Sequence, residues 1–245
     1  MQDMSEGGFP RENGVKVASN CVLKAIEGTW PFAEQYAAEI EANWEKAKAF
    51  NSNYFNGVVY LTKDAWLVGS EIHATLIRTD FKSYLYWRGQ GFPDAGVIDG
   101  FGSALIRSSD GNFMLILQRP GNVNHGFAYL PSGFIDQNDV LSDGSIDIGR
   151  SVEREVDEEI GEAGSSLQRE EGFIVARVGV HLCMAVPFYL PMTSQEFVSR
   201  VAYHNETTDD AEIETVVPIG HLDDLAPLKV LPHARALLEA LLVAR

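Results

Sequence analysis

The stretch Arg154-Glu155-Val156-Asp157-Glu158-Glu159-Ile160-Gly161 places four acidic side chains within five consecutive positions. In a helix, Glu155, Glu158 and Glu159 are three and four residues apart, so they share one face. The opposite face carries an apolar stripe at four-residue intervals, formed by Val152, Val156 and Ile160. The stretch therefore predicts an amphipathic helix that packs one face on a core and presents carboxylates on the other.

Two interpretations of the acidic face follow from composition alone. Glu-rich helical runs are most often solvated surfaces. Clustered carboxylate oxygens are also what hard divalent cations such as Mg²⁺ prefer as ligands. The upstream run Leu130-Pro131-Ser132-Gly133-Phe134-Ile135-Asp136 reads as a strand that ends in a glycine turn, and this context favours the second interpretation.

Together the two pieces resemble the signature of the Nudix hydrolases: a glycine, a glutamate, then R-E-U-x-E-E-x-G-U, where U is aliphatic. The core R-E-U-x-E-E-x-G matches Arg154 to Gly161 at every position, whereas the last aliphatic position is Glu162. Gly133 and Arg154 are 21 positions apart, about seven more than in the family. Counted back from Arg154, the first glutamate of the signature falls at Ile146, beside Asp147. Whether Asp147 replaces that glutamate is left open.

The resemblance implies metal-dependent hydrolysis of the pyrophosphate bond in a nucleoside diphosphate linked to another moiety, X, which releases a nucleoside monophosphate. The implied cofactor is Mg²⁺ or Mn²⁺, with Glu155, Glu158 and Glu159 as metal ligands and the backbone carbonyl of Gly133 as a further ligand. Arg154 and the same three glutamates are the implied catalytic residues, and Glu158 or Glu159 is able to help deprotonate the attacking water. Gly133 also serves the turn, and both roles can hold together. Arg154 is implied to hold a glutamate in a two-pronged ion pair, a geometry that lysine cannot match.

Several further residues are candidates for substrate contacts or proton transfer. Arg119, at the end of an apolar strand, is a candidate phosphate contact, and His125 either touches substrate or is an ordinary loop histidine. The late acidic loop offers a possible general base in Asp209, Asp210 or Glu212, with a solvated loop as the alternative. Arg78, Lys82 and Arg88 are expected to be surface charges unless the N-terminal part covers the site.

The resemblance also implies the fold, a Nudix α/β/α sandwich with a mixed sheet, over residues from about 96 to 245. Residues 1–95 are expected to form a smaller α+β domain, because a glycine- and proline-rich linker follows near residue 90. Within it, residues 1 to about 28 show no clear period and predict an irregular lead-in, and a helix is expected from Pro31 to about Ala47. Tyr54-Phe55-Asn56-Gly57, with the inserted signature, is similar to the Nudix branch that cleaves UDP-sugars.

Composition limits the partners. The chain has 245 residues, 45% of them hydrophobic, and a formal net charge of −16, which argues against a nucleic-acid polymer or an acidic membrane as partner. No apolar run is long enough for a membrane span. Two cysteines make no disulfide framework, so a reducing cytoplasm is the expected compartment.

A small nucleotide is the expected partner, and UDP-sugars and ADP-ribose-like compounds are favoured as substrates. The resemblance also allows a homodimer. The rival hypothesis is a non-catalytic module that senses nucleotides.

Overall fold

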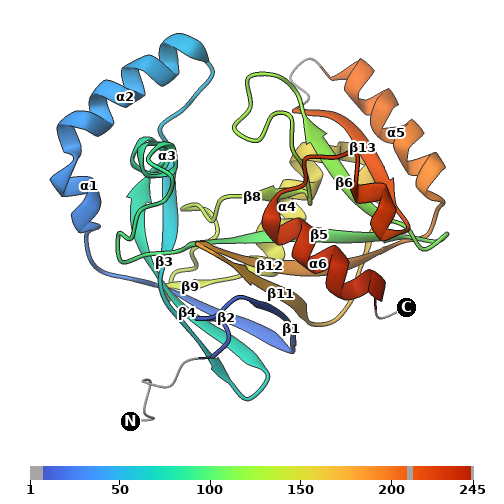
Figure 1. The fold of residues 1–245 in the computed structure, drawn as a ribbon, viewed down its shortest axis with the longest axis horizontal. Coiled ribbons are helices and arrows are strands. Elements are labelled where there is room, and N and C mark those ends of the chain that lie inside the picture. Colours follow the sequence, from blue (N-terminus) through green and yellow to red (C-terminus); the bar gives the residue numbers. More distant parts are fainter. Residues whose placement is uncertain (1–7, 209–211, 244–245) are drawn as a thin grey trace.

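A computed structural model describes residues 8–208 and 212–243, which form two β-sheets surrounded by helices (Figure 1). The larger sheet has the order β1-β11-β12-β5-β6-β13, with β10 on β12, β7 on β6 and β8 on β5. Its strands are β1 (Gly14–Ala18), β5 (Asp99–Ser108), β6 (Phe113–Gln118), β7 (Ala128–Tyr129), β8 (Ser132–Gly133), β10 (Gln168–Arg169), β11 (Phe173–Val178), β12 (His181–Leu190) and β13 (Ile213–Ile219). β5 and β12 are parallel and most other pairs are antiparallel, so the sheet is mixed.

The smaller sheet has the order β3-β4-β2-β9. Its strands are β2 (Asn20–Ile26), β3 (Val58–Val68), β4 (Glu71–Asp80) and β9 (Ser145–Ile146). The helices are α1 (Pro31–Gln35), α2 (Ala37–Phe50), α3 (Phe81–Gly89), α4 (Ile148–Ile160), α5 (Ser194–Thr207) and α6 (Pro232–Val243), with short 3₁₀ turns at Gly161–Gly164 and Leu222–Leu225. The predicted mixed α/β class is confirmed. None of the described helices is long and apolar enough to cross a membrane.

Helices α4 and α6 cover opposite faces of the larger sheet. Successive side chains of a strand point to opposite faces. At Gly102 of β5, an added Cβ would lie 2.4 Å from Val152 of α4, so the missing side chain lets this helix approach closely. The neighbouring Phe101 turns the other way and packs its ring 4.9 Å from the ring of His233 on α6. The result is the predicted α/β/α layering (Figure 1).

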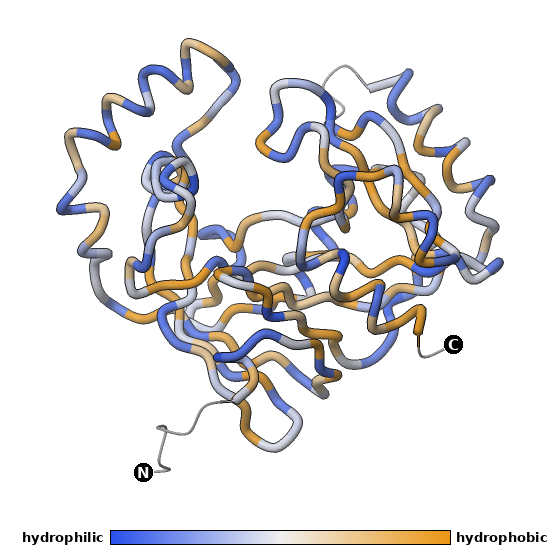
Figure 2. The backbone as a smooth tube through the Cα atoms, viewed as in Figure 1, coloured by the Kyte–Doolittle hydropathy of each residue, from blue (hydrophilic) through white to orange (hydrophobic). Residues whose placement is uncertain are grey.

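Both sheets draw strands from both sides of the boundary predicted near residue 95. β1 pairs with β11 of the larger sheet, and β9 pairs with β2 of the smaller one. One buried apolar cluster likewise joins Leu23 and Leu76 to Leu105 and Leu182. Figure 2 shows hydrophobic colour concentrated in the central strands, while α1 and α2 alternate in hydropathy. The two-domain division stays a prediction. Each predicted domain contributes one strand to the sheet that the other domain mainly forms, β1 to the larger sheet and β9 to the smaller one.

Two local predictions are corrected. The irregular lead-in over residues 1–28 is wrong for the described part, because β1 and β2 form there through pairing with β11 and β4. The helix expected from Pro31 to about Ala47 is interrupted at Tyr36, whose φ is −107°. Trp30 precedes its first turn, and no side chain caps the turn.

Candidate active site

Helix α4 is fixed at both ends and along one face. Asp147 caps its start, because Oδ1 accepts a hydrogen bond from the Arg150 backbone at 3.0 Å. The apolar stripe, now seen to be buried against the larger sheet, consists of Val152, Val156 and Ile160. Gly161 ends the helix with φ +60°, a conformation that favours glycine. The rotation of the helix, and so the direction of its carboxylates, is set by this packing.

The three glutamates of the predicted face do not share one environment. Glu159 is 5% exposed, and its Oε2 has no hydrogen-bond partner among the described residues. The side chain of Glu155 is 15% exposed, whereas that of Glu158 is 59% exposed. Glu155 and Glu159 line a cavity of about 1380 Å³, which Glu212 of the late acidic loop also lines. Glu158 lies outside this wall and faces Arg154.

Burial and mutual repulsion perturb these carboxyl groups. Burial raises the pKa of Glu155 to about 7, against the opposing effect of Arg154. Burial also raises the pKa of Glu159 well above its usual range, with Glu155 and Glu212 adding in the same direction. The pKa of Glu212 is raised by burial and by Glu158. A bound cation would relieve this repulsion, because it favours the charged form of each group.

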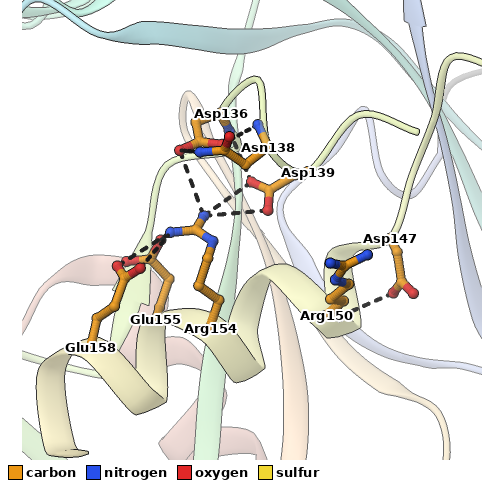
Figure 3. A network of polar contacts seen from close by, with 8 residues as sticks. All are labelled: Asp136, Asn138, Asp139, Asp147, Arg150, Arg154, Glu155 and Glu158. Atoms are coloured by element: carbon orange, nitrogen blue, oxygen red, sulfur yellow. Dashed lines mark hydrogen bonds and ion pairs between the residues drawn. The ribbon is translucent and has the colours of Figure 1, made fainter. Parts of the chain in front are cut away.

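Arg154 connects the helix to the loop that precedes it (Figure 3). Its Nη1 lies 2.8 Å from Glu155 Oε1 and 3.3 Å from Glu158 Oε2. Its Nη2 donates to both oxygens of Asp139 at 3.3 Å and lies 3.8 Å from Asp136 Oδ2. Although burial opposes the charged form, the surrounding carboxylates raise the pKa of Arg154. The guanidinium therefore orients Glu155 on one side and anchors the loop on the other.

Asp139 is the buried acid that pairs with Arg154. Its side chain is 3% exposed, and it pairs with Arg154 while accepting a hydrogen bond from the Asp136 backbone at 2.9 Å. Ile146, the position reached by counting back from Arg154, is instead a buried apolar residue of β9. Asp147 is the helix cap and no substitute for the glutamate. Counting forward from Gly133 by the family's spacing reaches residue 139, so the insertion lies after Asp139, where β9 docks on β2.

Gly133 lies directly against the carboxylates. A Cβ added there would fall 1.9 Å from Cδ of Glu155, so only glycine permits this approach. Gly133 pairs with Gly102 in the sheet, and its φ does not require glycine. The close approach, more than the turn, therefore explains this residue, and its carbonyl as a metal ligand stays a prediction.

The remaining candidate residues divide between the cavity and its surroundings. Arg119 and Glu212 line the cavity, and the Arg119 backbone donates to the Glu212 carbonyl at 2.9 Å. His125 is exposed and lies 3.2 Å from the Gln118 carbonyl through Nδ1. Asp209 and Asp210 lie outside the described residues. Arg88, expected at the surface, lines the cavity and donates to Val123 and Asn124 of the neighbouring loop.

The site fits a divalent cation in its chemistry. Glu155, Glu159 and Glu212 supply oxygen donors to the cavity lining, and Oε2 of Glu159 has no hydrogen-bond partner among the described residues. Within the described residues, no three acidic, histidine or cysteine side chains already stand in metal-ligand geometry. Arg154 accounts for part of this, since it draws Glu158 and Glu155 toward itself.

Part of the chain is similar to several solved structures. No family model matches the chain, and no curated protein matches it. Similar solved structures include RenU, a Nudix hydrolase from M. smegmatis, at 17% identity over 60% of this chain and 84% of that one, with a TM-score of 0.41. A MutT protein from Methanosarcina mazei Go1 shares 19% identity over 58% of this chain and 91% of its own, with a TM-score of 0.38. A Nudix hydrolase from Nitrosomonas europaea shares 15% identity over 60% of this chain and 90% of its own, with a TM-score of 0.40.

Proposed function

We propose that the chain is a divalent-metal-dependent hydrolase that cleaves the pyrophosphate bond of a nucleoside diphosphate linked to another moiety, X. The observation that carries the proposal is that the half-buried Glu155 and the buried Glu159 both line a large cavity, where their carboxylates repel each other and Oε2 of Glu159 has no hydrogen-bond partner among the described residues. A buried charge cluster of this kind is costly unless a ligand compensates it. Nucleotide sugars and ADP-ribose-like compounds are the favoured substrates.

The chain's own residues supply binding, orientation and proton transfer. Glu155 and Glu159 would hold Mg²⁺ or Mn²⁺, and Arg154 keeps the Glu155 carboxylate in place through its 2.8 Å contact. The ion would neutralise the pyrophosphate charge and make an attacking water more acidic. Arg119 and Arg88 bring positive charge to the cavity wall for the phosphates.

Glu212 is the described residue best suited to accept the proton of the attacking water. It lines the cavity, and its raised pKa brings its basicity closer to neutral pH. Addition of water across the P–O–P bond gives a nucleoside monophosphate and phosphorylated X. The side-chain oxygen of Glu212 takes one water proton in that step.

A panel assay tests the proposal. The purified chain with Mg²⁺ is offered UDP-glucose, UDP-galactose, ADP-ribose, NADH, dinucleoside polyphosphates and nucleoside triphosphates, and the products are identified by ³¹P NMR. We expect a nucleoside monophosphate from at least one nucleotide sugar or from ADP-ribose, and no reaction in EDTA. Absence of metal-dependent turnover on every compound would sink the proposed hydrolysis.

A second candidate, a nucleotide sensor without turnover, is favoured by one observation. Arg154 pairs with Glu158, so a residue implied as a ligand is engaged elsewhere. Metal-dependent binding of a nucleotide that is never cleaved, with affinity lost in Glu159→Gln, would select the sensor over the enzyme.

A further inference from the structure

A second polar cluster lies in the same cavity as the carboxylates, at the starts of the parallel strands β5 and β12. The register pairs Asp99 with His181, so the sheet itself brings the two side chains together. His181 Nδ1 lies 3.1 Å from Asp99 Oδ2, and the Tyr84 hydroxyl donates to the same oxygen at 3.0 Å. Since a carboxylate only accepts, Nδ1 of His181 carries the proton, and in the neutral ring Nε2 is left as an acceptor.

His233 extends this cluster from α6. It is 4% exposed and lines the cavity, and neither of its ring nitrogens has a hydrogen-bond partner among the described residues. Its ring centroid is 5.8 Å from that of His181. Leaving a buried polar group without a hydrogen-bond partner destabilises the folded state. A fold that retains such a histidine in a cavity wall has a polar group in place for a ligand.

Aromatic rings border the same place. Phe101 packs 4.9 Å from His233, and Phe92 packs 5.1 Å from His181 in an edge-to-face arrangement. Phe92 has φ +59°, a left-handed conformation that bulky residues rarely adopt, and its ring is also held by Trp87 at 4.8 Å. Backbone strain of this kind concentrates at ligand sites, where surrounding packing maintains it.

The charge of the cluster indicates what it can bind. The Asp99 carboxylate disfavours a further anion, and burial together with His181 lowers the pKa of His233 to about 3, so that ring is neutral. A neutral imidazole offers one donor and one acceptor, which matches a hydroxyl group. Arg88, one helical turn after Tyr84, interacts with the Tyr84 hydroxyl as well as donating to Val123 and Asn124, so its positive charge offsets the charge of the Asp99 carboxylate here. The local chemistry therefore suits neutral hydroxyls flanked by apolar rings.

We propose that Asp99, His181 and His233, with Tyr84 positioning Asp99, form the subsite for an uncharged, hydroxyl-bearing X group of the substrate. The inference rests on the proposed function, because it assigns the second end of the same cavity. The carboxylates of α4 lie on one face of the larger sheet and His233 on the other, so one extended ligand would pass the starts of β5 and β12 between them. The cluster thus selects a sugar-like X over a further phosphate.

The test measures binding with the full chain, with Ca²⁺ in place of Mg²⁺ to slow hydrolysis. Dissociation constants are determined by calorimetry for UDP-glucose and UDP, and for ADP-glucose and ADP, and the pair that the unmodified chain binds more tightly is used. We expect His233→Phe to weaken binding of the nucleotide sugar at least about tenfold and to leave the nucleoside diphosphate within about twofold. His233→Leu is the second variant, in case the larger ring disturbs packing.

His73→Phe is the matched control, because His73 also contacts an aromatic ring, that of Trp66 at 5.9 Å, but lies on β4 in the smaller sheet. It should change neither constant. The subsite would be overturned if His233→Phe and His233→Leu weakened binding of the nucleotide sugar and of the nucleoside diphosphate equally, or weakened binding of neither. It would also be overturned if the unmodified chain bound no sugar nucleotide. Cleavage without this selective loss overturns the subsite alone, and selective loss without any cleavage overturns the hydrolysis alone.

Discussion

The carboxylate site on α4 and the histidine cluster at β5, β12 and α6 share one cavity but differ in how their charges are compensated. Glu155 and Glu159 crowd like charges together, and burial raises their pKa values. His233 carries a neutral ring, because burial lowers its pKa to about 3. The first region stores electrostatic repulsion that a cation relieves, whereas the second holds polarity without charge. On the proposed function, this contrast places the chemistry at one end of the cavity and the recognition of X at the other.

The largest expected effect comes from removing a charge at the chemical end. Glu159→Gln should lower kcat for the best substrate of the panel by about a thousandfold, because one oxygen donor for the cation is lost. Folding should not suffer, since a buried carboxylate without a partner for Oε2 is replaced by a neutral amide of the same shape. Steady-state rates in Mg²⁺ measure kcat, and thermal melts in Mg²⁺ measure the stability of the fold.

The matched control is Asp157→Asn, which removes an exposed acid from the same helix. It should leave kcat within about twofold of the unmodified chain, since the field of an exposed charge is screened. Comparable losses in Asp157→Asn and Glu159→Gln would mean that general acidity of α4, not the cavity carboxylate, supports the reaction.

A second effect separates Asp139 from Asp147. Asp139→Ala should cost about 3 kcal/mol of unfolding free energy, because it leaves Arg154 without its buried partner. It should also lower kcat/KM about 10- to 100-fold, as loss of a residue that orients a ligand does. Asp147→Ala removes only a helix cap and should cost about 1 kcal/mol with little change in kcat/KM. Urea unfolding and initial rates compare the two, and a larger rate loss in Asp147→Ala would contradict the assignment.

A third, pH-dependent effect belongs to the recognition end. The pKa of His233 falls from 6.5 to about 3 on folding, so below pH 6.5 the unfolded chain binds a proton that the folded chain does not. This contribution to stability is complete above pH 6.5 and is lost as the pH falls toward 3. His233→Phe removes this pH-dependent loss. Its free energy of unfolding should therefore rise by about 2 kcal/mol relative to that of the unmodified chain when the pH is lowered from 7.5 to 5.

Urea unfolding at both pH values measures that gain, with His73→Phe again as the control. If the difference in unfolding free energy between His233→Phe and the unmodified chain is the same at both pH values, His233 is readily protonated in the folded state. The ring would then be charged at acidic pH, and the contrast between the two ends of the cavity would fail.

The smallest effect is expected at His125, which is exposed and contacts the Gln118 backbone. His125→Ala should change kcat/KM less than about twofold, because His125 is not among the described residues that line the cavity. A loss of tenfold or more, measured with the best substrate, would place the loop around His125 at the substrate and redraw that side of the cavity.

The sequence was informative where the site follows one helix. The spacing of Val152, Val156 and Ile160 predicted the buried face of α4, and the adjacent glutamates marked its other side. Periodicity alone did not distinguish Glu158 from Glu159, since the burial of each side chain depends on how β8 packs against the helix. Asp139 was missed because the first glutamate of the signature was located by counting back from Arg154, although forward counting from Gly133 reaches Asp139.

The histidine cluster left no comparable signal in the sequence. Asp99, His181 and His233 are far apart along the chain, and the parallel register of β5 and β12 together with the packing of α6 brings them to one place. The early strands were missed for a similar reason. β1 and β2 are stabilised by partners distant in sequence, and local pattern carries little information about such pairing.

Binding of Mn²⁺, followed by the relaxation of water protons without any nucleotide, tests the central claim most directly. The unmodified chain should bind the ion, Glu159→Gln should bind it at least about tenfold more weakly, and Asp157→Asn should match the unmodified chain. Equal Mn²⁺ affinity in all three proteins would contradict the assignment of the buried α4 carboxylates as the metal site.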